Sequence, residues 1–77
     1  MDDETNASVG RAVRARRDEL GISQATLASQ LGISQPMLVK LEQGRGVISM
    51  TRLASIATLL KTDLAALFLQ SYMSANG

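Results

Sequence analysis

Residues 22–34 read ISQATLASQLGIS, and this stretch decides the fold. Ser23 is a favoured N-cap residue, and the residues after it place apolar side chains on one face at helical spacing. Gly32 interrupts that pattern, and Ser34 is a second favoured N-cap two residues later. The stretch therefore predicts two short helices, over residues 23–31 and from residue 34 to about residue 43, joined by a sharp turn.

The residues around the turn suit a close crossing of these two helices. Ala28 is small, and Gly32 can take the left-handed conformation at little cost. Ile33 and Leu38 would fill the angle between the helices. A glycine-containing turn of three or four residues between short helices is typical of a helix-turn-helix unit, whose second helix can lie in a major groove. On the helical wheel, the outward positions of that second helix are Gln35, Pro36, Val39, Lys40 and Gln43.

Outside this unit, the chain predicts three more helices and no sheet. Apolar residues recur at helical spacing over residues 8–20, over about 49–60 and from residue 64 onward. No run of alternating β-branched residues occurs. The expected fold class is all-α, a five-helix bundle. We expect residues 1–7 to be a flexible acidic tail, residues 8–69 to be the domain, and residues 70–77 to be a C-terminal tail.

Composition excludes several classes of protein. The 77 residues suffice for one domain, and they include no cysteine and no histidine. Disulfides, zinc fingers, thiolate nucleophiles and histidine acid–base catalysis are therefore excluded. The two aromatic residues, Phe68 and Tyr72, are too few for a base-stacking single-strand binder. No phosphate-binding or dinucleotide-binding glycine pattern is present, so we expect no enzyme, no metal and no cofactor.

The first four residues and the longest apolar run indicate where in the cell the protein is expected. Residues 1–4 read MDDE, and this acidic start does not fit a signal peptide. The longest apolar run, Leu64–Leu69, is far shorter than the ~20 residues of a membrane-spanning helix. We expect a cytoplasmic protein.

Charge is distributed unevenly along the chain. The net charge is +1, but three of the seven acids lie at positions 2–4. From Thr5 onward, eight basic residues face four acidic ones, and six of the eight are arginine. Arginine suits phosphate and base edges. The bias fits nucleic-acid binding, and it also fits an ordinary solvated helix face.

Residues 22–34, together with LEQG at 41–44, resemble the phage repressor and Cro family of XRE-type helix-turn-helix regulators. The resemblance covers about Val9 to Phe68. It implies a lambda-repressor-like domain that regulates transcription as a sequence-specific repressor. It also implies that a homodimer binds a palindromic operator in double-stranded DNA, with the third helix in the major groove.

The resemblance assigns roles position by position. By this match, Gln35, Pro36 and Lys40 would meet base edges, and Gln24 and Arg45 would meet phosphates. We also expect Val39, an apolar residue on the exposed face, to meet a thymine methyl group, and Ser34 and Gln43 to contact phosphates. Arg17 and Glu42 match an ion pair that links the first and third helices. Two of these positions have an equally good structural interpretation: Pro36 can simply start the helix, and Val39 can be partly buried.

The sequence departs from the family pattern at three places. Thr26 replaces the glutamate that completes a capping box. Gly46-Val47-Ile48 replaces the usual Asn-Pro of the following loop, which puts its phosphate contacts in doubt. Lys61 stands where a glycine usually closes the fourth helix.

Apolar residues beyond the family core predict a dimer seam, formed by Phe68, Leu69, Tyr72 and Met73. Two alternatives keep the fold and change the role. The chain could be an antitoxin or a restriction-modification controller, with a toxin or another protein partner, or an interaction module that no longer binds DNA. The polar outer face of the third helix, with Gln35, Lys40 and Gln43, favours DNA over an interaction module.

Overall fold

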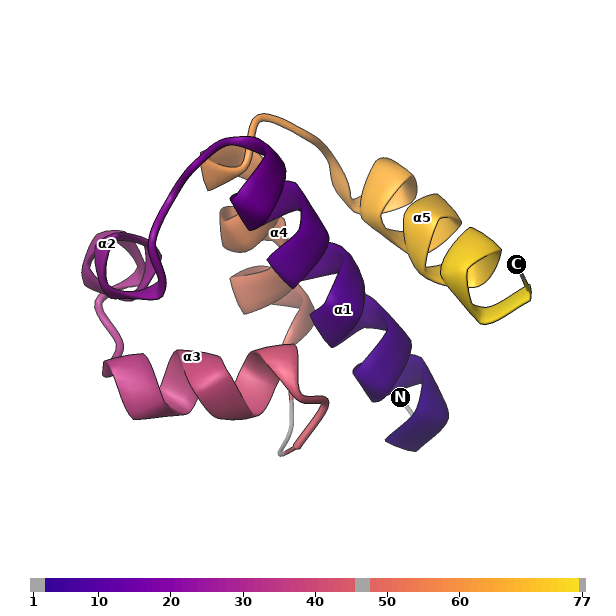
Figure 1. The fold of residues 1–77 in the computed structure, drawn as a ribbon, viewed down its shortest axis with the longest axis horizontal. Helices are drawn as coiled ribbons and strands as arrows, with labels where there is room; N and C mark the ends of the chain where they lie inside the picture. The colour runs from indigo at the N-terminus through magenta and orange to yellow at the C-terminus, as the bar shows by residue number, and fades with distance from the viewer. Residues whose placement is uncertain (1–2, 46–47, 77) are drawn as a thin grey trace.

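The computed structural model describes residues 3–45 and 48–76, and these form five helices without a strand (Figure 1). The prediction of an all-α, five-helix fold is therefore confirmed. In chain order the helices are α1 (Asp3–Glu19), α2 (Gln24–Leu31), α3 (Gln35–Glu42), α4 (Met50–Leu59) and α5 (Leu64–Asn76).

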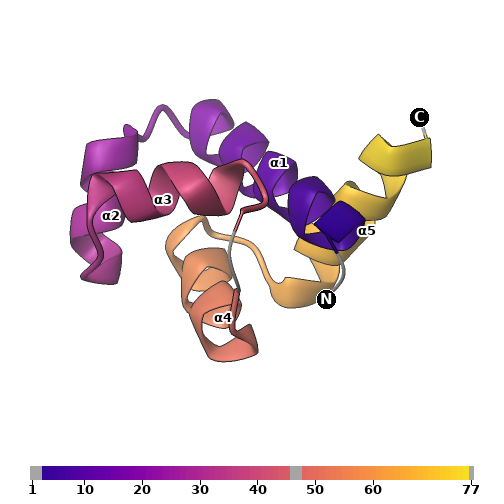
Figure 2. The same cartoon turned by 90° about the horizontal axis from the view of Figure 1, so that it is seen from below.

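The long helix α1 organises the bundle. It packs against α5 along one side and against α3 on another, while α2 packs on α3 and α4. Figure 2 shows α3 crossing the view in front of α1, with α4 on one side of it and α5 farthest from α2. The buried apolar residues form one cluster that draws on all five helices: Val9, Ala12, Val13, Leu27, Ala28, Leu38, Leu41, Ile48, Leu53, Ile56, Ala57, Leu60 and Leu67.

Short polar side chains begin the four later helices. The hydroxyl oxygens of Ser23, Ser34 and Ser49 each accept a hydrogen bond from the amide three residues along, at 3.0, 3.2 and 3.1 Å. Asp63 Oδ1 accepts from the amide of Ala66 at 2.8 Å. The first amides of a helix have no partner within the helix, so each cap stabilises it by ~1 kcal/mol. The predicted starts of these helices agree with the structure.

The two ends of the fold are more helical than the sequence indicated. Helix α1 begins at Asp3 rather than Ser8, so it includes residues 3–7, which the sequence assigned to a tail, and α5 continues through residues 70–76. Met1, Asp2 and Gly77 lie outside the described residues. Helices α1 and α5 lie side by side, so the added turns at the start of α1 and the end of α5 extend the contact between them (Figure 1). Apolar periodicity missed the start of α1 because the buried residues there include the polar Asn6 and Ser8.

The end of α4 is closed by a residue from α1. Lys61, at the position where a glycine was expected, has a φ of +56°. The Arg16 guanidinium donates to the carbonyl oxygens of Leu60, at 2.9 Å, and of Lys61, at 3.2 Å. Arg16 therefore supplies partners for carbonyls that the end of a helix leaves without one.

Within residues 3–45 and 48–76, no single helix is long and apolar enough to cross a membrane. Helix α4 and the Leu64–Gln70 part of α5 would pass such a test only as a pair, and they are bent by 92° at the break between them.

Candidate nucleic-acid interface

The turn between α2 and α3 has the geometry that the sequence indicated. Gly32 has a φ of +71°, and its amide donates to the Ser29 carbonyl oxygen at 3.1 Å. The Ile33 amide donates to the Ala28 carbonyl oxygen at 3.0 Å. These bonds satisfy the last carbonyls of α2 and turn the chain sharply into α3. Ala28 of α2 and Leu38 of α3 are both buried in the same core cluster.

An ion pair fixes the other end of α3 to α1. Arg17 Nε lies 2.8 Å from Glu42 Oε2, and Arg17 Nη2 lies 3.2 Å from Glu42 Oε1. The side chains are only 9% and 2% exposed. The hydrogen bond that the Arg17 guanidinium donates to Glu42 raises the pKa of Arg17 above its usual value, against the opposing effect of burial. The two residues that the resemblance paired are thus in bidentate contact.

Two further contacts extend this ion pair into a network across three helices. Arg17 Nη1 donates to the Ile22 carbonyl oxygen at 2.8 Å, just before α2. Gln24 Nε2 donates to Glu42 Oε1 at 3.0 Å. Glu42 therefore ties α1, α2 and α3 together at the C-terminal end of α3.

Close backbone packing supports the same contact between α1 and the C-terminal end of α3. A Cβ built at Gly10 of α1 would lie 2.5 Å from the Leu41 carbonyl oxygen and 2.6 Å from that of Glu42. Only glycine lets α1 approach the end of α3 this closely. No role was predicted for Gly10 from the sequence, although a glycine inside a predicted helix is a usable signal of close approach.

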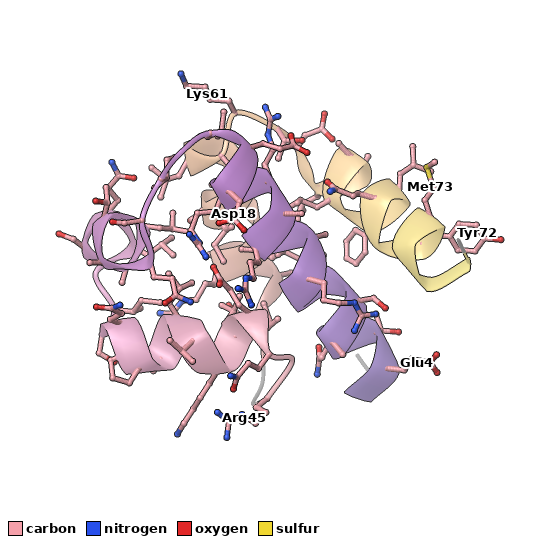
Figure 3. The ribbon with its side chains drawn as sticks, viewed as in Figure 1. Glu4, Asp18, Arg45, Lys61, Tyr72 and Met73 are labelled. Carbon is pink, nitrogen blue, oxygen red and sulfur yellow. The ribbon has the colours of Figure 1, made fainter. Side chains whose placement is uncertain are left out.

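The outer face of α3 brings together all four residues assigned to base edges. Gln35, Pro36 and Lys40 are exposed and Val39 is half-buried. Together with Arg45 they line a shallow hollow that is largely open to solvent. Arg45 lies at the lower edge of the molecule in Figure 3, beneath α3.

The residues assigned to phosphates surround this face but already make contacts within the protein. Gln24 is half-buried and uses one amide hydrogen on Glu42. Ser34 is exposed, and its hydroxyl oxygen caps α3. Gln43 and Arg45 are exposed and are hydrogen-bonded to each other through Gln43 Oε1 and Arg45 Nη2. Gly46 and Val47, where the family pattern is broken, lie outside the described residues.

The other arginines of α1 contact partners on α1 or near the end of α4. Arg11 donates to Ser8 Oγ at 3.1 Å, and Arg14 Nε lies 3.9 Å from Asp18 Oδ2. Arg16 holds the end of α4, next to Lys61, and Figure 3 places Lys61 at the opposite edge of the molecule from Arg45. Arg16 is therefore far from the outer face of α3.

Arg52 is a basic residue near α3 that the sequence analysis did not assign. It lies in the first turn of α4, and its Nη1 is 3.5 Å from Met37 Sδ on α3. This contact places a cation beside the N-terminal half of α3. An arginine in the first helical turn after the loop could have indicated it, because a cation there is unfavourable for the helix dipole and needs another reason.

The predicted dimer seam divides into two parts. Leu69, Tyr72 and Met73 of α5 are 60%, 66% and 62% exposed. Phe68 is half-buried and packs against the core instead. Figure 3 shows Tyr72 and Met73 on α5, at the edge of the molecule away from α2 and α3.

Comparisons with known proteins agree with this geometry. A family model described as Helix-turn-helix matches residues 13–67. An uncharacterized transcriptional regulator in the ATPase CF(0) region of Rhodospirillum rubrum is 41% identical over 63 residues, which make up 82% of this chain and 58% of the relative. An uncharacterized HTH-type transcriptional regulator of Sinorhizobium medicae is 35% identical over 60 residues, or 78% of this chain and 43% of the relative.

A solved structure is similar over most of its length. The clp gene regulator ClgR from Corynebacterium glutamicum superposes with a TM-score of 0.87 at 28% identity, covering 91% of this chain and 90% of that chain. The chain spans about half the length of the two curated relatives. The names of all three are those of regulators and not of enzymes, in agreement with the sequence prediction.

Proposed function

This chain belongs to the helix-turn-helix family of transcriptional regulators, and we propose that it binds double-stranded DNA. Helix α3 lies in the major groove. One observation carries the proposal. The only carboxylate of α3, Glu42, is buried against Arg17, so the exposed face of α3 offers Lys40 and no acid to an approaching phosphate backbone.

Base reading is assigned to the polar residues of the outer face. Gln35 suits adenine, whose edge offers a donor and an acceptor, and Lys40 suits the two acceptors of guanine. Both side chains are exposed on the helix that the buried network holds in place. Phosphate contacts fall to Gln24, Ser34, Gln43 and Arg45 at the margins of this face, and Arg52 adds a cation beside Met37.

The operator is an inverted repeat bound by a homodimer. A single α3 of eight residues contacts too few base pairs to specify a site, and two-fold symmetry doubles the contacts. The exposed apolar side chains of Leu69, Tyr72 and Met73 supply a surface that a second copy can bury. Half-sites one helical turn apart, about 34 Å, fit such a dimer. A small domain bound across a promoter acts as a repressor by occupying it.

Selection of bound sites from random DNA tests the recognition. Gln35→Ala and Lys40→Ala should each weaken binding to the selected site by ~1–3 kcal/mol and relax preference at one or two positions. Lys61→Ala is the matched control, because it removes a lysine from the opposite edge of the molecule. Equal losses on selected and random DNA would contradict base reading. Absence of any selected sequence would contradict the proposed function.

Sedimentation at micromolar concentration tests the assembly. The wild-type chain should dimerise alone or on its site, and Leu69→Asp should shift it toward the monomer because a charge would enter the apolar seam. Lys61→Asp, on a different surface, should leave the dimer intact. A wild-type chain that remains monomeric both free and on DNA would refute the dimer, and a dimeric Leu69→Asp would refute this seam.

A further inference from the structure

The hollow on the outer face of α3 is lined by two apolar residues, two cations and Gln35. Pro36 and Val39 are three residues apart, so they lie one turn apart on the same face of the helix. Lys40 and Arg45 line the same hollow. Val39 is half-buried, so only part of its side chain is exposed in the hollow.

An apolar surface of this kind requires an apolar partner when α3 meets the base edges. Hydrogen-bonding groups of a base pressed against Pro36 or Val39 would lose water without gaining a partner. On the major-groove edges of the four base pairs, the 5-methyl group of thymine is the apolar feature. The neighbouring cations Lys40 and Arg45 complement the phosphate backbone that carries such a base.

We propose that Pro36 and Val39 read the 5-methyl group of a thymine in each half-site, an inference that rests on the proposed DNA-binding function. Gln35 and Lys40 then determine the neighbouring bases by hydrogen bonding. The other exposed apolar residue of α3, Met37, lies outside this hollow, and its sulfur faces Arg52. The methyl reader is therefore confined to the Pro36–Val39 pair.

Replacing thymine by uracil in the selected site tests the inference, because uracil lacks the methyl group and keeps every hydrogen-bonding group. Burial of one methyl group is worth ~0.8 kcal/mol, so uracil at the recognised position should weaken wild-type binding about fourfold per half-site. Val39→Ala should bind more weakly to the thymine site and distinguish thymine from uracil much less. Pro36→Ala provides a second, independent variant.

Gln35→Ala is the matched control within the same face. It should bind more weakly overall and still distinguish thymine from uracil about fourfold. Uracil placed outside the half-sites should have no effect. Wild-type binding that is unchanged by uracil at every half-site thymine would refute the inference while leaving the proposed function intact.

Two other outcomes are equally decisive. If both Val39→Ala and Pro36→Ala retain the full preference for thymine, another residue reads the methyl group. Cytosine also carries this group once it is methylated. If the affinity instead depends on 5-methylcytosine at a half-site cytosine, the thymine assignment is wrong.

Discussion

Two adjacent arginines of α1 each hold one contact between helices, and we call these two contacts joints. Arg17 holds the joint between α1 and α3, and Arg16 holds the joint between α1 and the end of α4. Arg17 faces α3, is nearly buried, and contacts a carboxylate that is itself buried. Arg16 faces the end of α4, is 29% exposed, and contacts two backbone carbonyls and the exposed Glu19. The two residues are of the same type and both connect helices, but their side chains differ in solvent exposure.

The difference predicts unequal energetic roles. Loss of Glu42 would leave Arg17 with little water and with only the exposed carboxylate of Asp18, 3.1 Å from its Nη1, as a counter-ion, which is strongly destabilising. Loss of Arg16 would leave carbonyls and a carboxylate that solvent can reach. The joint that positions α3 should therefore depend on its arginine far more than the joint at the end of α4 does.

The largest effect is expected for Glu42→Ala. It leaves Arg17 charged in a site that is almost fully buried, so the free energy of unfolding should fall by ~3–5 kcal/mol. Denaturant unfolding measures this change. Arg14→Ala is the control, because its 3.9 Å contact with Asp18 is exposed and worth only ~0–1 kcal/mol. Equal stability of Glu42→Ala and the wild-type chain would contradict burial of the pair.

The same pair has a defined pH dependence. The pKa of Arg17 is raised in the folded state, so its stabilising effect is complete below the unfolded pKa and is lost only as pH rises through the folded pKa. The difference in unfolding free energy between the wild-type chain and the double variant Arg17→Met/Glu42→Gln, which leaves no unpaired buried charge, should therefore stay constant from about pH 7 to pH 10. A difference that shrinks across this range would contradict a raised pKa.

Arg16→Ala should have an intermediate effect. Two hydrogen bonds to carbonyls at the end of α4 are lost, but water can replace part of them, so we expect a loss of about 1 kcal/mol. Arg16→Lys keeps the charge beside Glu19 and removes the planar fork that spans both carbonyls. If the lysine variant is as stable as the wild-type chain, the charge and not the fork matters. A loss as large as that of Glu42→Ala would erase the contrast between the two joints.

Local signals predicted the inner helices, and tertiary packing determined the ends. The caps Ser23, Ser34 and Ser49 and the turn at Gly32 act over a few residues, so the sequence alone could locate α2, α3 and α4. Residues 3–7 and 70–76 are helical where α1 and α5 lie side by side, and that contact between distant segments has no local pattern.

The candidate site shows the same division. The outward positions of α3 followed from helical geometry, and the Arg17–Glu42 pair came from the family resemblance. The bond from Gln24 to Glu42 and the contact of Arg52 with Met37 depend on rotamers and helix crossings, which no spacing in the sequence reveals. The partners of Arg16 could not be predicted either, because a backbone carbonyl leaves no mark in the sequence.

Lys61→Gly should have the smallest effect, and it is the one expected to stabilise the fold. Lys61 has a φ of +56°, which costs a residue with a Cβ about 1–2 kcal/mol and glycine almost nothing. Glycine also gives the unfolded chain more freedom, which offsets about 0.4–1 kcal/mol of the gain. The net increase in the free energy of unfolding should be about 0.5 kcal/mol, a rise in Tm of roughly 2–4 °C for a domain of this size.

Lys61→Ala separates the effect of the backbone from the effect of the charge, because it removes the ammonium group but keeps the Cβ. If the alanine variant gains as much as the glycine variant, relief of charge and not of the backbone is responsible. If the glycine variant is less stable than the wild-type chain, the Arg16 contacts depend on a rigid Lys61, and the weaker of the two joints is stronger than the comparison implies.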